Sequence, residues 1–254
     1  MVSIDINSDM GESFGRWTLG DDTSMLGLIS SANIACGFHA GDPSVMLRTL
    51  TKAHQHQVCI GAHVSYRDLA GFGRRSIDVP AEVLQADVEY QLAAIQGLAN
   101  ATGSAVRYVK PHGALYNRIV DDEVQASAVV HAIVALNANL GLLTLPDSAV
   151  GKLADEAGLR VFHEAFADRA YTPEGRLVSR NLPDSVISDP AAVAQRVSQL
   201  VLTHHIEAID GSTIAVSADS VCVHGDTPGA VAMAKSINHR LSEDGINIAS
   251  FMDR

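Results

Sequence analysis

The sequence lacks the long apolar run that would mark a membrane helix. His, Asp, Arg or Gly interrupts every apolar stretch before it reaches the roughly 18 residues that a helical span requires. The N-terminus also lacks the basic start and apolar centre of a signal peptide. We therefore expect a protein that is neither secreted nor bound to a membrane.

Cysteine and positive charge are both scarce. The three cysteines, Cys36, Cys59 and Cys222, are few and odd in number, which argues against a disulfide framework. This favours the cytoplasm as the compartment. The 18 lysines and arginines against 29 aspartates and glutamates leave a formal net charge of −11. Nucleic-acid partners require a basic face, so the charge argues against them.

Hydrophobic residues are abundant enough for one large core. They make up 47% of the 254 residues. Barrels of alternating strands and helices often have this length as a single domain. We find no internal repeat, low-complexity tract or linker that would divide the chain, and we predict one domain over residues 1–254.

Seven short apolar runs each end in a cluster of polar residues. The runs cover 3–9, 33–36, 60–62, 106–109, 141–145, 160–163 and 221–223. Helical patterns that begin at Asp or Pro, several of them ended by Gly, cover 42–53, 80–103, 121–135, 147–158, 189–201 and 226–245. The alternation predicts an α/β fold, a single seven-stranded TIM-like barrel. In such barrels the active site lies at the carboxyl ends of the strands, so we predict an enzyme.

Four histidines stand at the ends of different predicted strands: His39, His63, His112 and His224. One such histidine would more often be a core residue, but four that converge by topology favour a site for metal binding or proton transfer. Candidate carboxylates join them at the predicted strand ends: Asp5, Asp9, Glu12, Asp42, Glu164, Asp168 and Asp226. At least one should act as a general base toward water. We expect the following side chains to face one cavity, with His224 and Asp226 at its rim: Asp9, His39, His63, His112 and Glu164.

A metal site and a nucleophilic cysteine are further hypotheses for the same region. Asp9 with His39 and His63 would suit a divalent metal such as Mg²⁺ that activates water, although no tight two-histidine spacing occurs. Cys36 is a weaker candidate, because free cysteines in strands are more often inert packing residues.

The few arginines are concentrated in two loops that follow predicted strands, 67–75 and 166–188. A guanidinium group binds carboxylate or phosphate bidentately, so this placement favours an anionic substrate. The second loop is long enough to act as a lid. Asp42 and Asp226 precede helix-start prolines, and helix capping explains them equally well. The predicted substrate-binding residues are Lys110, Arg74, Arg169, Arg180, His224 and Asp226.

Sequence blocks at these positions resemble the LamB/YcsF family. They are DINSDMGE at 5–12, ANIACGFHAGD at 32–42, GAH at 61–63, FGR at 72–74, VKPHGALYN at 109–117, EAFADR at 164–169 and VHGD at 223–226. The blocks follow the family order and cover nearly the whole chain. Departures at Ser8, Val64 and Arg67 leave the polar strand-end set unchanged.

The resemblance implies a barrel similar to the glycoside hydrolase/deacetylase type. It also implies ATP-dependent opening of 5-oxo-L-proline (pyroglutamate) to L-glutamate, with subunits B and C of a 5-oxoprolinase as partners. The chain has no P-loop, which fits ATP being handled jointly with those subunits. The sequence leaves homo-oligomerisation open. Two alternatives remain: a metal-dependent deacetylase or amidohydrolase that acts alone, and a non-catalytic regulatory subunit.

Overall fold

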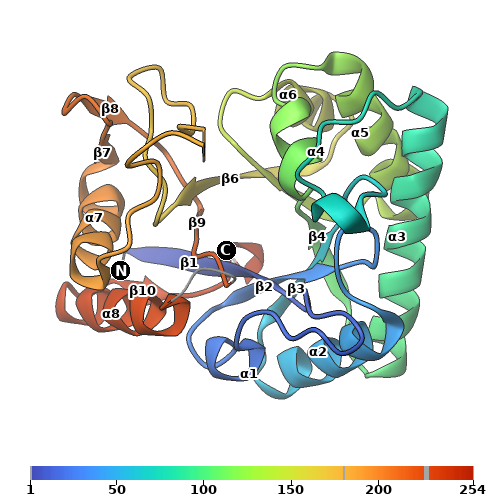
Figure 1. The fold of residues 1–254 in the computed structure, drawn as a ribbon, viewed down its shortest axis with the longest axis horizontal. Helices are drawn as coiled ribbons and strands as arrows, with labels where there is room; N and C mark the ends of the chain where they lie inside the picture. The colour runs from blue at the N-terminus through green and yellow to red at the C-terminus, as the bar shows by residue number, and fades with distance from the viewer. Residues whose placement is uncertain (1, 180, 226–228, 254) are drawn as a thin grey trace.

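Seven parallel strands close into a barrel in the computed structural model of the chain, which describes residues 2–179, 181–225 and 229–253. The strands are β1 (Ser3–Met10), β2 (Ser31–Ala35), β3 (Cys59–His63), β4 (Val106–Val109), β5 (Gly141–Thr144), β6 (Arg160–Phe166) and β9 (Ser220–Cys222). Each strand pairs in parallel with the next, and β9 pairs with both β6 and β1 to close the ring. The predicted seven-stranded TIM-like barrel is confirmed (Figure 1).

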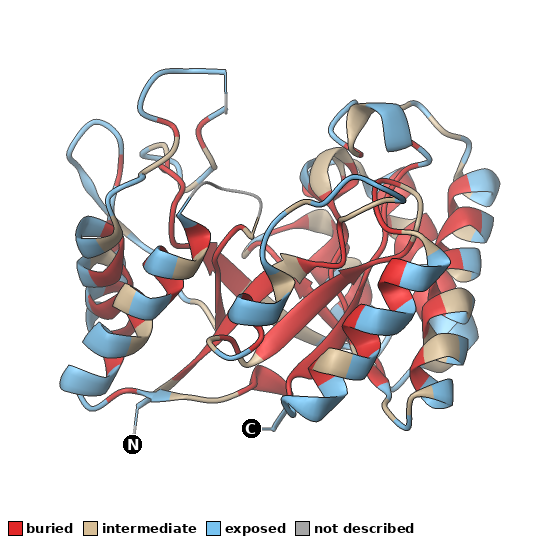
Figure 2. Ribbon diagram, turned by 60° about the horizontal axis from the view of Figure 1, so that its bottom comes forward, coloured by how far each residue is buried: buried red, intermediate tan, exposed pale blue. Residues whose placement is uncertain are grey.

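In the described part of the chain, six longer helices surround the barrel. They are α2 (Pro43–Gln55), α3 (Ala81–Ala101), α5 (Glu123–Asn137), α6 (Ala149–Glu156), α7 (Pro190–Thr203) and α8 (Ala230–Glu243). Several predicted helix starts are confirmed by side chains that accept hydrogen bonds from first-turn N–H groups: Asp42, Asp122, Ser148 and Asp189. The inward faces of the helices are buried and their outward faces exposed, so the apolar core lies between helices and strands (Figure 2).

Shorter elements escaped prediction because they carry little periodic pattern. They are α1 (Asp22–Met25), α4 (Gly113–Arg118), the 3₁₀ helices η1 (Leu69–Gly71) and η2 (Phe251–Asp253), the antiparallel pair β7 (His205–Glu207) and β8 (Thr213–Ala215), and β10 (Asn247–Ile248). β10 pairs with the first residues of β1. Phe251 and Met252 then pack against Tyr108 and Cys59, which covers the amino-terminal end of the barrel with apolar side chains.

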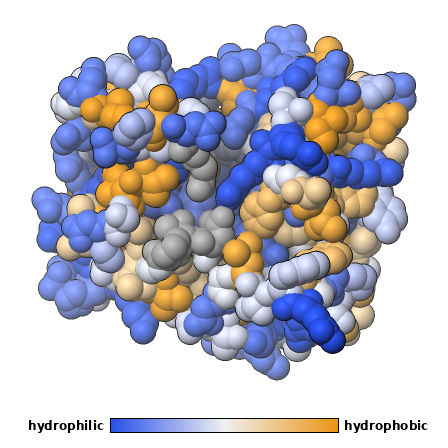
Figure 3. Space-filling model, in the orientation of Figure 1, coloured by the Kyte–Doolittle hydropathy of each residue, from blue (hydrophilic) through white to orange (hydrophobic). Residues whose placement is uncertain are grey.

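The opposite, carboxyl end of the barrel is covered by loops. The loop after β3 contains η1, and the long loop after β6 folds back on itself through isolated pairings of Arg169 with Val186 and Tyr171 with Leu177. Figure 3 shows hydrophobic side chains in separate patches among hydrophilic ones on the face of the molecule seen in Figure 1. Within the described ranges, no helix is both long and apolar enough to cross a membrane.

Candidate active site

A cavity of about 420 Å³ opens at the carboxyl end of the barrel. Its polar walls come from strand ends and the loops that follow them: Asp9, His63, Arg74, Lys110, His112, Arg169 and His224. Phe166, Leu177 and Val178 supply an apolar side. The strand-end rule therefore placed three of the five predicted cavity residues correctly, namely Asp9, His63 and His112, and it also placed His224.

Below this cavity lies a buried polar group, here called the inner network: Asp5, Asn7, Ser31, Asn33, Tyr108 and Ser220. The Ser31 hydroxyl donates to Asp5 Oδ1 at 2.6 Å, and the Ser220 hydroxyl donates to Asp5 Oδ2. Asn7 Nδ2 donates to Ser220 Oγ at 2.7 Å. In each of these bonds a donor meets an acceptor, as buried polar atoms require.

The second half of the inner network spans the barrel. Asn33 Nδ2 donates to Asn7 Oδ1 at 2.7 Å, and the Tyr108 hydroxyl donates to Asn33 Oδ1 at 2.6 Å. The Tyr108 ring crosses over Gly61, where an added Cβ would lie 2.3 Å from the ring. Sequence reasoning missed Asn7, Asn33 and Tyr108, because nothing in the sequence tells which residues of separate strands meet inside a barrel.

Lys110 joins the inner network to the cavity. Its Nζ lies 3.0 Å from Glu164 Oε2 and 3.2 Å from both Asp9 Oδ1 and Asn7 Oδ1. Burial alone would lower the pKa of Lys110, but the carboxylates and Cys222 around it raise that pKa well above its usual value. Burial likewise opposes ionisation of Asp9, yet His63 and Lys110 hold the pKa of Asp9 well below its usual value. Both groups are therefore charged at neutral pH.

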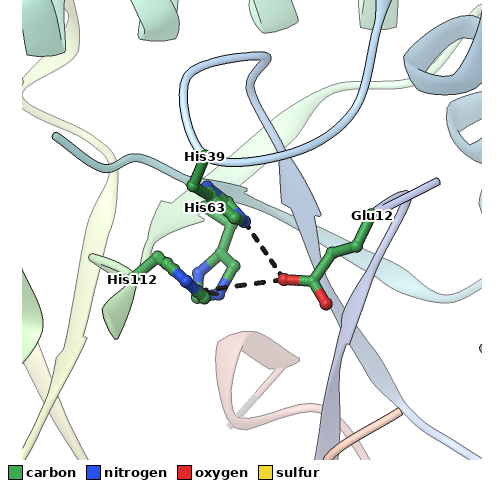
Figure 4. A group of neighbouring side chains, drawn as sticks. All are labelled: Glu12, His39, His63 and His112. Atoms are coloured by element: carbon green, nitrogen blue, oxygen red, sulfur yellow. Dashed lines mark hydrogen bonds and ion pairs between the residues drawn. The ribbon is translucent and has the colours of Figure 1, made fainter. Parts of the chain in front are cut away.

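Four side chains form what is called here the histidine cluster: Glu12, His39, His63 and His112. Figure 4 shows Glu12 facing the three imidazole rings. His39 Nε2 lies 3.1 Å from Glu12 Oε1, and His112 Nδ1 lies 2.9 Å from His63 Nε2. The rings of His39 and His112 stack with centroids 3.7 Å apart.

Burial keeps two of these histidines neutral. It lowers the pKa of His112 to about 3 and the pKa of His39 well below its usual value. The loop after η1 closes over both rings at Gly73, whose φ of +63° favours glycine. A Cβ at Gly73 would lie 2.7 Å from His112 and 2.8 Å from His39, so a larger residue there would disturb the cluster.

His224 pairs with a carboxylate that sequence reasoning did not connect to it. Its Nδ1 lies 2.8 Å from Asp168 Oδ1 and 3.0 Å from Oδ2, and Asp168 is 1% exposed. The His224 ring also stacks on Phe166. A carboxylate bound to Nδ1 fixes the orientation of the ring and leaves Nε2 for proton transfer at the cavity. Asp168 was a candidate from its strand-end position alone, and its spatial partner could not be read from the sequence.

Two of the five residues expected at the cavity, His39 and Glu164, do not line it, which corrects the expectation of one shared cavity. His39 and Glu12 are buried in the histidine cluster beside it, and they do not line it. Glu164 is wholly buried in the barrel, where it is paired with Lys110, and it lines a separate hollow with His163 and Tyr171. Strand-end position therefore brought these side chains close together without placing all of them on one surface.

Three arginines of the two loops form ion pairs with aspartates outside the cavity. Arg67 pairs with Asp87, Arg75 with Asp68, and Arg176 with Asp121. Within the described residues, Arg74 and Arg169 are the arginines of these loops that line the cavity.

The two cavity arginines differ in their surroundings. Arg74 lies over the Phe72 ring, with 4.9 Å from its Cζ to the ring centroid. Arg169 is buried and donates to the carbonyl of Val178 at 2.5 Å, so it also orders the loop that carries it. The predicted substrate residues Arg180 and Asp226 lie outside the described residues.

The hypothesis of a nucleophilic Cys36 is not supported. The thiol is buried, and burial raises its pKa to about 12. A thiol with that pKa stays protonated at neutral pH, and the thiolate is the nucleophilic form. Asp42 accepts hydrogen bonds from the N–H groups of Val45 and Gly15, so it caps α2.

A parallel barrel whose carboxyl-end cavity holds a carboxylate paired with a buried lysine and an imidazole oriented by Asp168 is typical of TIM-like barrel enzymes. The chain belongs to the LamB/YcsF family, whose model matches residues 4–254. The predicted family is thereby confirmed.

Relatives match the chain over nearly its whole length. It is 56% identical over 252 residues to the 5-oxoprolinase A subunit of Cutibacterium acnes, with 98% of each chain covered. It is 55% identical to the protein of the same name in Mycobacterium avium, with 99% of this chain and 100% of that one covered. A crystal structure of a lactam utilization protein from Thermus thermophilus superposes with a TM-score of 0.93 at 40% identity, covering 98% of this chain and 99% of that one.

Proposed function

We propose that the chain is the A subunit of a 5-oxoprolinase, which opens 5-oxo-L-proline to L-glutamate with hydrolysis of ATP. The observation that carries the proposal is the cavity at the carboxyl end of the barrel, which combines Asp9, Lys110, Arg74 and the His224–Asp168 pair. The full-length similarity to proteins named as 5-oxoprolinase A subunits supports the assignment of substrate.

The cavity suits a small anionic ring. Its volume of about 420 Å³ lies in the range of roughly 300–1,000 Å³ that small-molecule sites occupy. Arg74 offers a guanidinium group to the substrate carboxylate, and the apolar side formed by Phe166 and Leu177 can take the methylene groups of the ring. The contact of Arg169 with substrate remains a prediction, because its guanidinium already donates to the protein backbone.

The reaction needs both activation and proton transfer. A lactam is an amide and therefore a poor electrophile. Phosphorylation of the lactam oxygen by ATP would make the carbonyl carbon electrophilic enough for attack by water. Asp9, which Lys110 holds ionised, accepts a proton from that water. When the ring C–N bond breaks, the nitrogen must gain a proton, and His224, oriented by Asp168, donates it. This step leaves the phosphoryl group on the side-chain carboxyl of the product, and a second water then hydrolyses that acyl phosphate to L-glutamate and inorganic phosphate.

ATP and the partners belong to the proposal rather than to this chain alone. The sequence has no P-loop, so we propose that the nucleotide is handled together with subunits B and C. All three cysteines are free and buried, which supports a cytoplasmic location.

The test is release of glutamate from 5-oxo-L-proline by the complex of the three subunits. We expect turnover that requires ATP and all three of them. Hydrolysis of a simple amide by this chain alone, without ATP, would favour the deacetylase alternative. Turnover by the partner subunits in the absence of this chain would favour a regulatory role.

A further inference from the structure

Two rings of the histidine cluster each have one nitrogen committed to an oxygen that can only accept. His63 Nδ1 lies 2.8 Å from the carbonyl oxygen of Lys110, and His112 Nε2 lies 2.9 Å from that of Phe72. A carbonyl oxygen has no hydrogen to give, so both of these ring nitrogens carry the proton. In neutral rings the other two nitrogens, His63 Nε2 and His112 Nδ1, therefore present bare lone pairs.

His39 also has a proton on its outer nitrogen, Nδ1, because that nitrogen donates to a hydroxyl oxygen. The Ser65 hydroxyl donates its hydrogen to the carbonyl of Tyr66 at 3.0 Å, so Ser65 Oγ accepts from His39 Nδ1 at 3.1 Å. His39 Nε2 is then bare as well, and it faces Glu12 Oε1, which is also an acceptor when ionised.

These bare acceptors converge on one point. His63 Nε2 and His112 Nδ1 are 2.9 Å apart, and ligand atoms of all four cluster residues lie within 4.8 Å of one another (Figure 4). Lone pairs at that distance repel unless a proton or a metal ion lies between them.

The surroundings favour the metal ion. Histidines that bind metals commonly donate their outer N–H to a backbone carbonyl, carboxylate or water, which fixes the tautomer and turns the other nitrogen to the ion. All three rings of the cluster have such an outer hydrogen bond, to Lys110, Phe72 and Ser65. Glu12 supplies a carboxylate as the fourth ligand. A second carboxylate oxygen, Asp9 Oδ2, lies 3.3 Å from His63 Nε2.

We infer that Glu12, His39, His63 and His112 form a binding site for a divalent transition-metal ion. Three imidazoles and one carboxylate suit Zn²⁺, Co²⁺ or a related ion, whereas Mg²⁺ prefers oxygen ligands. This ligand set therefore differs from the expected set of Asp9, His39 and His63 with Mg²⁺. Metal binding is measurable without turnover, so the inference is tested independently of the proposed reaction.

The experiment uses the full-length chain, stripped with a chelator and dialysed against Co²⁺ or Zn²⁺. We expect one equivalent of bound metal, visible absorption from the cobalt form and a higher unfolding temperature, because only the folded chain brings the ligands together. His63→Ala and His112→Ala should abolish all three signals. The matched control His54→Ala, on the exposed face of α2, should keep them.

A positioning variant sharpens the test. Ser65→Ala keeps every proposed ligand but removes the acceptor that fixes His39, and we expect metal affinity to fall about 10–100-fold. If the metal affinity of this variant equals that of the wild type, the hydrogen bond from His39 to Ser65 does not prepare His39 for the metal.

Two other results would overturn the site. The first is a folded wild-type chain that takes up neither Co²⁺ nor Zn²⁺, and this result does not depend on whether the variants fold. The second is wild-type affinity in both alanine variants, which would place the ion elsewhere, for example at Asp9, Cys222 and His224.

Discussion

The inner network and the histidine cluster are both buried, polar and held by strands of the same barrel, yet their hydrogen bonding differs. In the inner network donors meet acceptors, as in the bonds from Ser31 to Asp5 and from Tyr108 to Asn33. In the histidine cluster, His63 Nε2 and His112 Nδ1 turn lone pairs towards each other. The first group satisfies itself and stabilises the barrel. The second is suited to a ligand, which shows that the donor and acceptor pattern separates function from structure better than polarity does.

The largest effect should come from Lys110, which joins the inner network to the cavity. Lys110→Met leaves Glu164 and Asp9 as buried carboxylates without their common counter-charge. We expect the free energy of unfolding to fall by about 3–5 kcal/mol, as when one partner of a buried ion pair is removed. Urea unfolding of this variant beside the exposed Lys152→Met measures the difference. Equal stability of the two variants would contradict the role of Lys110 as the counter-charge of these two carboxylates.

A substitution that affects the cavity should lower turnover more than it lowers the stability of the fold. Asp168→Asn keeps the shape of the side chain but removes the charge that orients His224. We expect turnover of the reconstituted complex to fall about 10²–10³-fold, which is typical for loss of acid–base assistance. Steady-state kinetics with thermal unfolding of the same samples checks this. A variant that unfolds readily but turns over normally when folded would assign Asp168 to structure.

Acid should destabilise the metal-free histidine cluster. Burial lowers the pKa of folded His112 to about 3, whereas an unfolded histidine titrates near 6.5. Between these values the unfolded chain binds the additional proton, so stability falls as the pH falls below about 6.5. For His112 alone we expect a loss of about 2 kcal/mol from pH 7 to pH 5 in metal-free protein. Urea unfolding at both pH values should show a smaller loss in His112→Gln, and an equal loss would refute the assignment.

The smallest effect should come from a conservative change in the inner network. Asp5→Asn keeps an acceptor for Ser31 but turns charge-assisted hydrogen bonds into ordinary ones. We expect a loss of about 1–2 kcal/mol of unfolding free energy and unchanged turnover per folded molecule. Turnover that falls far more than stability would show that the inner network takes part in the reaction.

The sequence predicted the barrel well because its signals are local. Each apolar run is short and continuous, and Asp42, Asp122 and Asp189 mark helix starts through contacts only two or three residues away. β10 escaped prediction because its two residues acquire a strand identity only by pairing with β1, more than 240 residues earlier in the chain.

The site could be predicted only as a set of strand ends. Topology brought Asp9, His63 and His112 together at the cavity, as the strand-end rule requires. The pairing of His224 with Asp168, 56 residues apart, depends on register and side-chain direction, which no local pattern records. The same reason explains why Glu164 was expected at the cavity but lies inside the barrel against Lys110.

The most direct test of the division between the two regions is ATP-coupled glutamate release by the complex carrying the Asp9→Asn, His63→Ala double variant. This variant changes the cavity and the histidine cluster, and Asp5→Asn in the inner network serves as its control. We predict that the double variant, folded by circular dichroism, releases no glutamate above background while the control keeps turnover. Full turnover by the double variant would contradict the assignment of the active site to the carboxyl end of the barrel.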